Sequence, residues 1–411
     1  MILVTSLLFI VGNNIPVLAS FRWFWAPIMI ATSMLFHPNT FKYRGVYSCL
    51  IYGVIYVIVL PATIWSNILT PYVSATFNDF YYIFVIVIMS TILKSNNYIN
   101  EWIKLAKIGL WFLVISGFMT IIATFFEPLA VRASYSDLQL ELEGFENIYR
   151  LGFGTYGYMT ALVAMFPLII FLVKRKHQWI SRQTSVFLIG FFYFVIFQSQ
   201  IFANIITATI TIIFALLGSQ NFKRNIVVTI IVVIVFNSTS KVFWINSLTN
   251  IGESFEEGSL FKGKLNDVVR FIEIDKPDLD EEATTGVQLR AARYPMLISV
   301  FLKSPLFGDA STNYNATDAY IMNVGKHLYW MSRLAMWGIF GFLGYLFILR
   351  NIFKSIFKLF DPDFKFYYTL SLLSIITLGL LKELVLRETY LVLFIIIPGL
   401  YLAQKKLELN K

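Results

Sequence analysis

Uncharged apolar stretches of about 20 residues recur along almost the whole of this 411-residue chain. A helix needs roughly that length to cross the hydrocarbon core of a bilayer, which is about 30 Å thick. Apolar residue types make up 57% of the sequence and charged types only 14%, whereas about a quarter of a typical soluble domain is charged. The pattern excludes a disordered chain, a coiled coil and an ordinary cytosolic enzyme. It predicts an all-α integral membrane protein.

The apolar stretches divide into about twelve predicted transmembrane helices. Residues 183–222 carry no charge, and because 40 residues are too many for one span they suit two spans that turn near residues 198–200. The N-terminal stretch has no basic flank, so we expect it to be the first span and not a cleaved signal peptide. The predicted spans are 2–19, 23–38, 46–65, 73–93, 107–126, 153–173, 184–200, 202–219, 225–237, 329–350, 366–382 and 388–404.

The distribution of Lys and Arg orients these spans. If both termini are cytoplasmic, 18 of the 33 basic residues but only four of the 24 acidic residues fall on the cytoplasmic side, which then carries a net charge of +14. Lys and Arg in short loops favour the cytoplasmic side of a membrane. The total charge of +9 is therefore a topology signal, and we expect no nucleic-acid partner. Both termini are predicted to be cytoplasmic.

The loops divide the chain into three regions. Residues 1–237 hold nine spans and a smaller outer loop, 127–152. Residues 238–328 form one long outer loop, and residues 329–411 hold the last three spans and a short cytoplasmic tail. Because loops of this length are usually functional, the long loop, predicted to be partly helical, is the first place to look for chemistry.

The second half of the long loop has an ordered pattern. A helix is predicted over 287–302, and Pro295 should either kink it or begin a second helix. Arg290 and Arg293 are three residues apart and therefore share one helical face. A turn with Pro305 and Gly308 follows.

The remaining candidate residues lie near the predicted outer ends of spans. His327 immediately precedes the tenth span, and Arg333 lies less than two turns further along it. Arg150 precedes the sixth span, while Lys382 and Arg387 lie at the turn between the last two spans.

Each of these residues also has an ordinary structural interpretation. His327 could be a snorkelling or packing residue at the interface, and Arg150 could be an interfacial anchor. Arg290 and Arg293 could belong to an amphipathic helix that rests on lipid headgroups. Lys382 and Arg387 could pair with the neighbouring glutamates or face a cavity. The residues alone do not separate these alternatives.

Two further patterns are weaker. Asp278-Leu-Asp280 has the form of the Asp-x-Asp element of metal-dependent glycosyltransferases, but it lies in an acidic stretch where such spacing is common by chance. Gly338, Gly341 and Gly344 form a small-residue stripe in the tenth span, which predicts close helix packing. We therefore expect no metal site and no other cofactor.

The order of these features resembles the O-antigen polymerase and O-antigen ligase superfamily of polytopic bacterial glycosyltransferases. Members have a large, late periplasmic loop with an Arg-bearing helix, a Pro-Leu-hydrophobic-Gly turn and a His at the start of the next span, before a Gly-rich stretch. The counterparts in this chain are Arg290 with Arg293, Ser304-Pro-Leu-Phe-Gly308, His327, Trp337-Gly-Ile-Phe-Gly-Phe-Leu-Gly344 and, before the sixth span, Tyr149-Arg150-Leu-Gly152-Phe-Gly154.

The resemblance implies a bacterial inner-membrane enzyme with a periplasmic active site. The donor would be an oligosaccharide on a polyprenyl diphosphate, and the acceptor a sugar hydroxyl of a second glycan. Arg150, Arg290 and Arg293 would bind the diphosphate without a metal, with Arg333, Lys382 and Arg387 as further candidates. His327 would be the catalytic base. Membrane lipids are implied as partners, and a chain-length regulator is compatible with such an enzyme.

The acceptor distinguishes two activities within this family. A polymerase transfers the glycan to a second lipid-linked repeat unit, whereas a ligase transfers it to the lipid A-core. Ser199-Gln200 and His327-Leu328 stand where ligases often have Ser-Arg and His-Asn, which favours a polymerase.

A flippase for lipid-linked oligosaccharide is the alternative from another class. Transporters usually place polar groups near the midplane and have repeated halves, and neither pattern is evident in this sequence.

Overall fold

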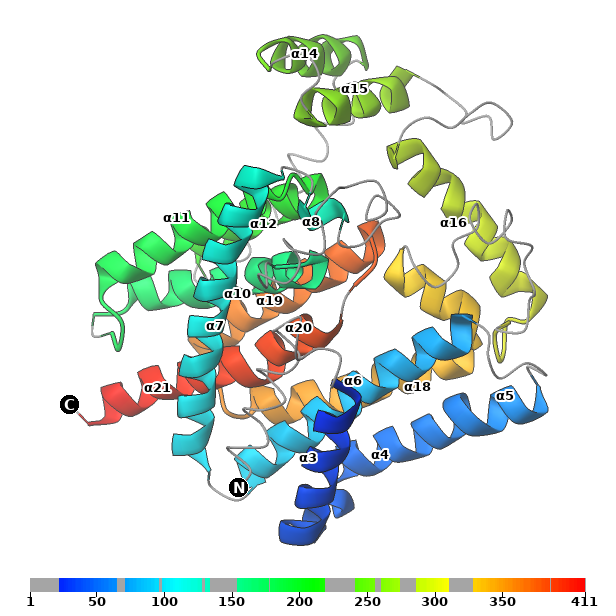
Figure 1. Cartoon of the computed structure of the whole chain (residues 1–411), viewed down its shortest axis with the longest axis vertical. Helices are drawn as coiled ribbons and strands as arrows, with labels where there is room; N and C mark the ends of the chain where they lie inside the picture. Colours follow the sequence, from blue (N-terminus) through cyan, green and yellow to red (C-terminus); the bar gives the residue numbers. More distant parts are fainter. Residues whose placement is uncertain are drawn as a thin grey trace.

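Every regular element in the described part of the chain is helical (Figure 1). The computed structural model describes residues 22–64, 71–95, 98–127, 130–133, 154–176, 178–218, 241–255, 260–273, 286–309, 328–384 and 386–410. The helices are α3 (Arg22–Phe36), η1 (Pro38–Lys42), α4 (Arg44–Gly53), η2 (Val54–Val59), α5 (Leu60–Thr63), α6 (Pro71–Ser95), α7 (Ile99–Phe126), α8 (Ala130–Ala133), α10 (Tyr156–Lys174), α11 (Arg182–Gln198), α12 (Phe202–Leu217), α14 (Lys241–Glu253), α15 (Leu260–Glu273), α16 (Gly286–Lys303), α18 (Tyr329–Phe357), α19 (Pro362–Leu381), α20 (Leu386–Leu391), η5 (Val392–Ile396) and α21 (Ile397–Leu409).

Seven of the described helices are long and apolar enough to cross a membrane, which supports a membrane-embedded, multi-pass, all-α protein. They are residues 44–63, 76–94, 99–126, 156–174, 329–357, 362–381 and 386–409. Three predicted spans match shorter apolar helices, namely part of α3, α11 and α12. The predicted spans 2–19 and 225–237 lie outside the described residues. The total of twelve therefore stays a prediction.

The division of residues 183–222 into two helices is confirmed over the part that the structure describes. Helix α11 ends at Gln198 and α12 begins at Phe202. Gln200, in the turn between them, has a φ of 54°, in the left-handed region that a tight reversal often uses. Helices α11 and α12 both pack on α10.

Helix α10 is the centre of the bundle. Sixteen of its 19 residues are buried. Nearly all of these 16 residues are apolar, and none of them is charged. It packs against α11, α12, α19 and α20 in the middle of the helical bundle (Figure 1). A helix that is apolar on all sides is expected inside a bundle and not at its edge. The outward faces of α7, α11 and α18 carry exposed large apolar side chains, as lipid-facing helices do.

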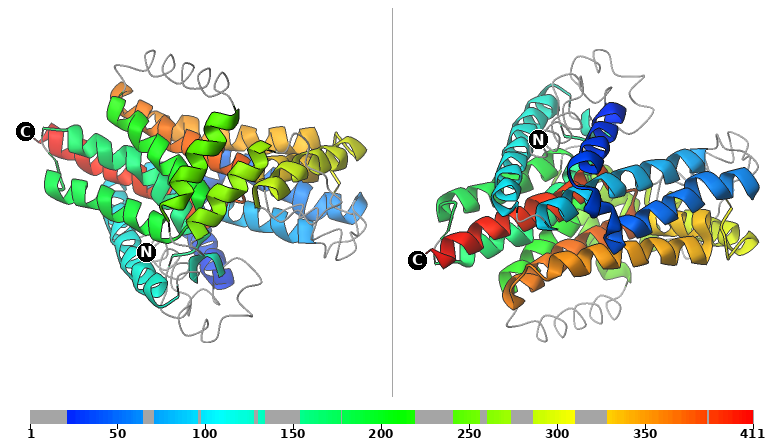
Figure 2. Two further views of the ribbon diagram at one scale, coloured as in Figure 1. Left: turned by 90° about the horizontal axis from the view of Figure 1, so that it is seen from above. Right: turned by 90° about the horizontal axis from the view of Figure 1, so that it is seen from below.

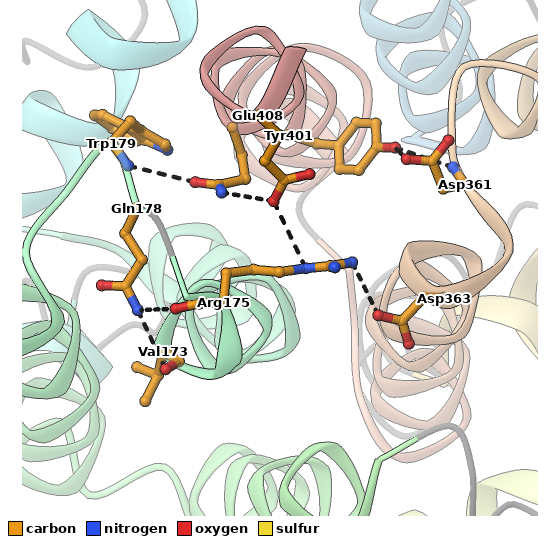
Figure 3. A network of polar contacts seen from close by, with 9 residues as sticks. Val173, Arg175, Gln178, Trp179, Asp361, Asp363, Tyr401 and Glu408 are labelled. Carbon is orange, nitrogen blue, oxygen red and sulfur yellow. Dashed lines mark hydrogen bonds and ion pairs between the residues drawn. The ribbon is translucent and has the colours of Figure 1, made fainter. Parts of the chain in front are cut away.

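Three segments that the charge pattern assigns to the cytoplasmic side meet one another. Arg175, after α10, forms an ion pair with Asp363 at 2.9 Å and lies 3.9 Å from Glu408 in the C-terminal helix (Figure 3). The Tyr401 hydroxyl donates a 2.5 Å hydrogen bond to Asp361 and lowers the pKa of that carboxyl. Contact among these distant segments agrees with the predicted topology, in which they share one side.

The described part of the long loop contains three helices. Helices α14 and α15 pack on each other, whereas α16 packs on α18 (Figures 1 and 2). The predicted helix over 287–302 is observed as α16, and it continues through Pro295 without interruption. The alternative in which Pro295 begins a second helix is therefore wrong.

Candidate functional site

A buried ionic cluster lies where the first turns of α18 meet α6 and the α19–α20 connection. Its centre is Arg333, whose side chain is only 2% exposed. The Arg333 Nε donates to Asp79 Oδ2 at 2.5 Å, and Nη2 lies 3.3 Å from Glu383 Oε1. Burying a charge is costly unless it is paired and hydrogen-bonded. The guanidinium therefore stays charged between two carboxyl groups.

A chain of tyrosine hydroxyls extends from this cluster into the bundle. The Tyr329 hydroxyl donates to Asp79 Oδ2 at 3.1 Å and lies 2.9 Å from the Tyr345 hydroxyl. The Tyr345 hydroxyl is in turn hydrogen-bonded to that of Tyr390 in α20. The Arg333 guanidinium also lies over the Tyr329 ring, 4.5 Å from its centroid. These contacts hold α6, α18 and α20 together around one polar centre.

The α19–α20 connection contributes the rest of the polar groups. Lys382 is 2% exposed; its Nζ lies 4.8 Å from the centre of the Tyr156 ring, at the start of α10. The Lys382 carbonyl accepts from the Tyr329 backbone N–H at 3.2 Å. In the first turn of α20, Arg387 pairs with the adjacent Glu388. Lys382 and Arg387 therefore differ: the first reaches towards α10, and the second has a local carboxylate partner.

Glu383 is the titratable group of most interest in this connection. Burial raises the pKa of its carboxyl to about 8, although the nearby Arg333 opposes that shift. The Glu383 Oε1 faces Arg333, whereas Oε2 is buried and makes no hydrogen bond with any described residue. A carboxyl in this state can exchange a proton near neutral pH.

Helix α18 is broken at Gly338, and the turn after α16 fills the break. Gly338 has φ 63° and ψ −174°, which no helix contains. The N–H groups of Ile339 and Phe340 donate to the carbonyls of Pro305 and Leu306 at 2.8 and 3.1 Å. These hydrogen bonds replace those that a continuous helix would make. A break at membrane depth is tolerated only where its backbone groups are satisfied in this way.

Two glycines allow the two backbones to touch. Gly308 has a φ of 79°, and a Cβ atom there would lie 2.0 Å from the Met336 carbonyl oxygen. A Cβ on Gly338 would lie 2.5 Å from the Gly308 nitrogen. Only glycine permits both the positive φ and this approach. The prediction that the glycine stripe serves close helix packing holds for Gly341, which faces Tyr56, but Gly338 instead terminates one helical segment and starts another.

An apolar cleft of about 380 Å³ lies between α18, α19 and the α20–η5 segment. Tyr390, the last member of the hydroxyl chain, and Leu384, the neighbour of Glu383, both line it. Most of the other lining side chains are Leu, Ile and Phe, with Arg350 among them. The cleft thus connects the polar centre to the apolar faces of α18 and α19.

The predicted site residues have different outcomes. Arg333 is at the polar centre, whereas Lys382 contacts it through its backbone carbonyl and directs its side chain towards Tyr156. Arg290 and Arg293 lie in α16 as predicted, with the Arg293 side chain half-buried and that of Arg290 outside the described side chains. His327 and Arg150 lie outside the described residues.

Sequence reasoning missed Asp79 and the tyrosine hydroxyls. An acidic residue inside an otherwise apolar predicted span was the available signal, because such residues are expensive in a membrane and usually functional.

Among the described residues, no group of three or more His, Cys, Asp or Glu is placed to hold a metal ion. The predicted Asp-x-Asp element lies outside those residues, and metal independence stays a prediction. No protein-family model and no curated protein sequence matches this chain.

Proposed function

We propose that the chain is an O-antigen polymerase, a membrane glycosyltransferase that acts on the periplasmic side of the bacterial inner membrane. One observation carries the proposal. The helix that bears Arg290 and Arg293 is joined through the Ser304–Gly308 turn to α18, and the same α18 carries Arg333 into a buried polar centre. This arrangement supports a site in which Arg290 and Arg293 are held next to the buried polar centre around Arg333.

The proposed donor is an oligosaccharide linked to a polyprenyl diphosphate. Arg290 and Arg293, together with Arg150, bind the diphosphate, because a guanidinium stays charged and grips phosphate oxygens with two N–H groups. Lys382 adds a positive charge nearby. Negative charge develops on the diphosphate as it leaves, and a preorganised donor at such a position contributes about 10²–10³ in rate.

The proposed reaction forms one glycosidic bond and breaks one sugar–phosphate bond. The acceptor hydroxyl oxygen attacks the anomeric carbon, and the bonding electron pair leaves with the lipid diphosphate. The hydroxyl proton goes to His327, which immediately precedes the buried residues Leu328 and Tyr329 at the start of α18. A neutral imidazole has a suitable pKa for this transfer and typically contributes about 10²–10⁴-fold.

The apolar cleft suits the polyprenyl chain of the donor. It extends from Tyr390 and Leu384, next to the polar centre, along the apolar faces of α18 and α19. An isoprenoid chain there would leave the diphosphate near the bases at the outer end of the bundle. A cleft lined by apolar side chains contributes affinity in proportion to the area that it buries.

A ligase uses the same chemistry with the lipid A-core as acceptor, and the described geometry does not favour one acceptor over the other. A flippase is the second candidate class, and the buried Asp79–Arg333–Glu383 cluster is the observation that favours it. However, Asp79 lies in the first turn of its span and not at mid-depth. This position is more typical of a site that opens to the outer surface.

Deletion of the gene, with the surface polysaccharide analysed on a gel, tests the proposal. Loss of a polymerase leaves one repeat unit on the core, and loss of a ligase leaves the core alone. Loss of a flippase leaves no lipid-linked glycan at the outer leaflet. Either of the last two results would overturn the proposed polymerase.

Complementation with variants then tests the diphosphate site. Arg290→Lys should lose most activity although it keeps the charge, because a lysine cannot make the two-pronged contact. Arg270→Lys, at an exposed position in α15 of the same loop, is the matched control and should restore normal polymer. Full activity of Arg290→Lys would indicate a headgroup anchor instead.

A further inference from the structure

The apolar cleft between α18 and α19 has a charged residue at one end. Among the described residues that line it, Arg350 alone is charged, and its side chain is exposed. Arg350 and Phe353 are the lining residues of α18 nearest to its connection with α19, on the predicted cytoplasmic side. Leu384 and Tyr390 line the opposite end, next to the buried polar centre. The cleft therefore has a basic end and an end near the outer site.

Arg350 is the first of three basic residues along one face of α18. Lys354 and Lys358 follow it at intervals of four residues, which places all three on the same side of the helix. All three are exposed, and none forms an ion pair with a described residue. Their charge is therefore available to an external anion.

Two other helices bring basic residues to the same part of α18. The Arg44 guanidinium, in the first turn of α4, lies 5.4 Å from the centre of the Phe347 ring. The Lys94 ammonium group, at the end of α6, donates to the carbonyl and the hydroxyl of Ser355 at 2.8 and 2.6 Å. Five bases from three helices therefore surround the cytoplasmic end of the cleft.

The apolar part of the cleft has the length of a lipid chain. Its lining on α18 extends from Phe342 to Phe353, in the helical segment that follows the break at Gly338. These 11 residues span about 16 Å along the helix axis. Half of the hydrocarbon core of a bilayer, which the acyl chains of one leaflet fill, is about 15 Å thick.

We propose that the cleft binds an anionic phospholipid of the cytoplasmic leaflet, with its phosphate at Arg350 and one acyl chain between α18 and α19. A guanidinium holds phosphate oxygens with two N–H groups, and the apolar side chains of the cleft bury the acyl chain. Basic pockets between membrane helices on the cytoplasmic side are typical sites for anionic headgroups.

The proposed glycan donor does not account for Arg350. Its diphosphate would lie near Lys382, at the outer end of the cleft, and Arg350 is at the other end. The phospholipid and the polyprenyl chain would share the apolar part, so the phospholipid occupies the cleft when no donor is bound. The inference goes beyond the proposed function and does not depend on it, because it uses only the contacts of α18 and its neighbours.

Native mass spectrometry of the full-length protein, titrated with phosphatidylglycerol or phosphatidylethanolamine of equal chain length, tests the headgroup contact. The wild type should bind the anionic lipid more tightly. Arg350→Gln should weaken that binding by about fivefold, because one base near an anionic lipid surface contributes about 1 kcal/mol. Arg182→Gln, at an exposed base in the first turn of α11, is the matched control and should bind as the wild type does.

A second pair of variants tests the acyl-chain contact. Leu346→Trp should fill the cleft and weaken binding, whereas Leu343→Trp, at an exposed position of α18 that does not line the cleft, should not. Equal binding of the two phospholipids, or unchanged binding by Arg350→Gln or Leu346→Trp, would overturn the proposal. Binding of a polyprenyl phosphate but not of phosphatidylglycerol would overturn it too and assign the cleft to the donor alone. If Leu346→Trp does not fold, Arg350→Gln remains decisive. None of these measurements uses glycan transfer, so failure of the proposed polymerase would not alter them.

Discussion

Gly308→Ala tests the contact between the turn and the break in α18. The new Cβ would lie 2.0 Å from the Met336 carbonyl oxygen and 2.6 Å from the Gly338 nitrogen, and both are backbone atoms that no side-chain rotation can move. The turn must therefore separate from α18. The separation would leave the Ile339 and Phe340 N–H groups without their present acceptors.

The expected loss of stability has two parts. A positive φ costs an alanine about 1–2 kcal/mol, and each buried N–H without an acceptor costs about 1–3 kcal/mol. Gly308→Ala should therefore lower the free energy of unfolding by about 3–8 kcal/mol.

Equilibrium unfolding in mixed SDS micelles, followed by tryptophan fluorescence, measures this difference. Gly190→Ala in α11 is the matched control, because a Cβ there meets no atom within 4 Å, and it should stabilise the helix by up to about 1 kcal/mol. A Gly308→Ala protein that unfolds within about 1 kcal/mol of the wild type would refute the reasoning, since the strain of the positive φ alone should cost that much.

Four further predictions concern the polar centre and the chemistry. Arg333→Gln should destabilise the protein by about 3–5 kcal/mol because it removes the guanidinium partner of the buried Asp79 carboxyl; adding Asp79→Asn should recover part of that loss in a double-mutant cycle, and strictly additive effects would contradict the pairing. The pKa of Glu383 is raised above the value of a free carboxyl, so stability should be highest below about pH 4.5 and fall as the pH rises to about 8, by up to about 1.4 kcal/mol per pH unit. Glu383→Gln should flatten that pH dependence, and an unchanged slope would assign it to another group. His327→Ala should insert and fold but yield single repeat units, whereas polymer of normal length would exclude it as the base. A chelator should leave polymer synthesis intact; loss of activity that a divalent ion restores would show metal dependence.

The positions of the membrane helices were largely predictable because hydrophobicity is a local property. The span predicted over 153–173 is observed as α10 (Tyr156–Lys174), and that over 366–382 as α19 (Pro362–Leu381). The helix predicted over 287–302 is likewise observed as α16 (Gly286–Lys303). In each case the apolar run and its charged or Pro/Gly flanks are contained in one segment.

The partners of the candidate residues were not predictable, because they depend on tertiary contacts between distant segments. Arg333 was a candidate, yet its partner Asp79 is 254 residues away. Gly338 and Gly341 belong to the same regularly spaced glycine stripe, yet Gly338 breaks the helix and Gly341 packs on Tyr56. The difference arises from the turn at Gly308, which the pattern of glycines in the span does not contain.

The central position of α10 has a consequence for biogenesis. Three of the segments that cover it, α19, α20 and α21, are complete only at Leu409, roughly 235 residues after α10 ends at Lys174. At about 5–20 residues per second, translation of that stretch takes on the order of 10–50 s. During this interval α10 is in the membrane without these three neighbours. Its all-round apolar surface lets lipid cover it for that time, and a charged substitution there would be harmful before folding is complete as well as after it.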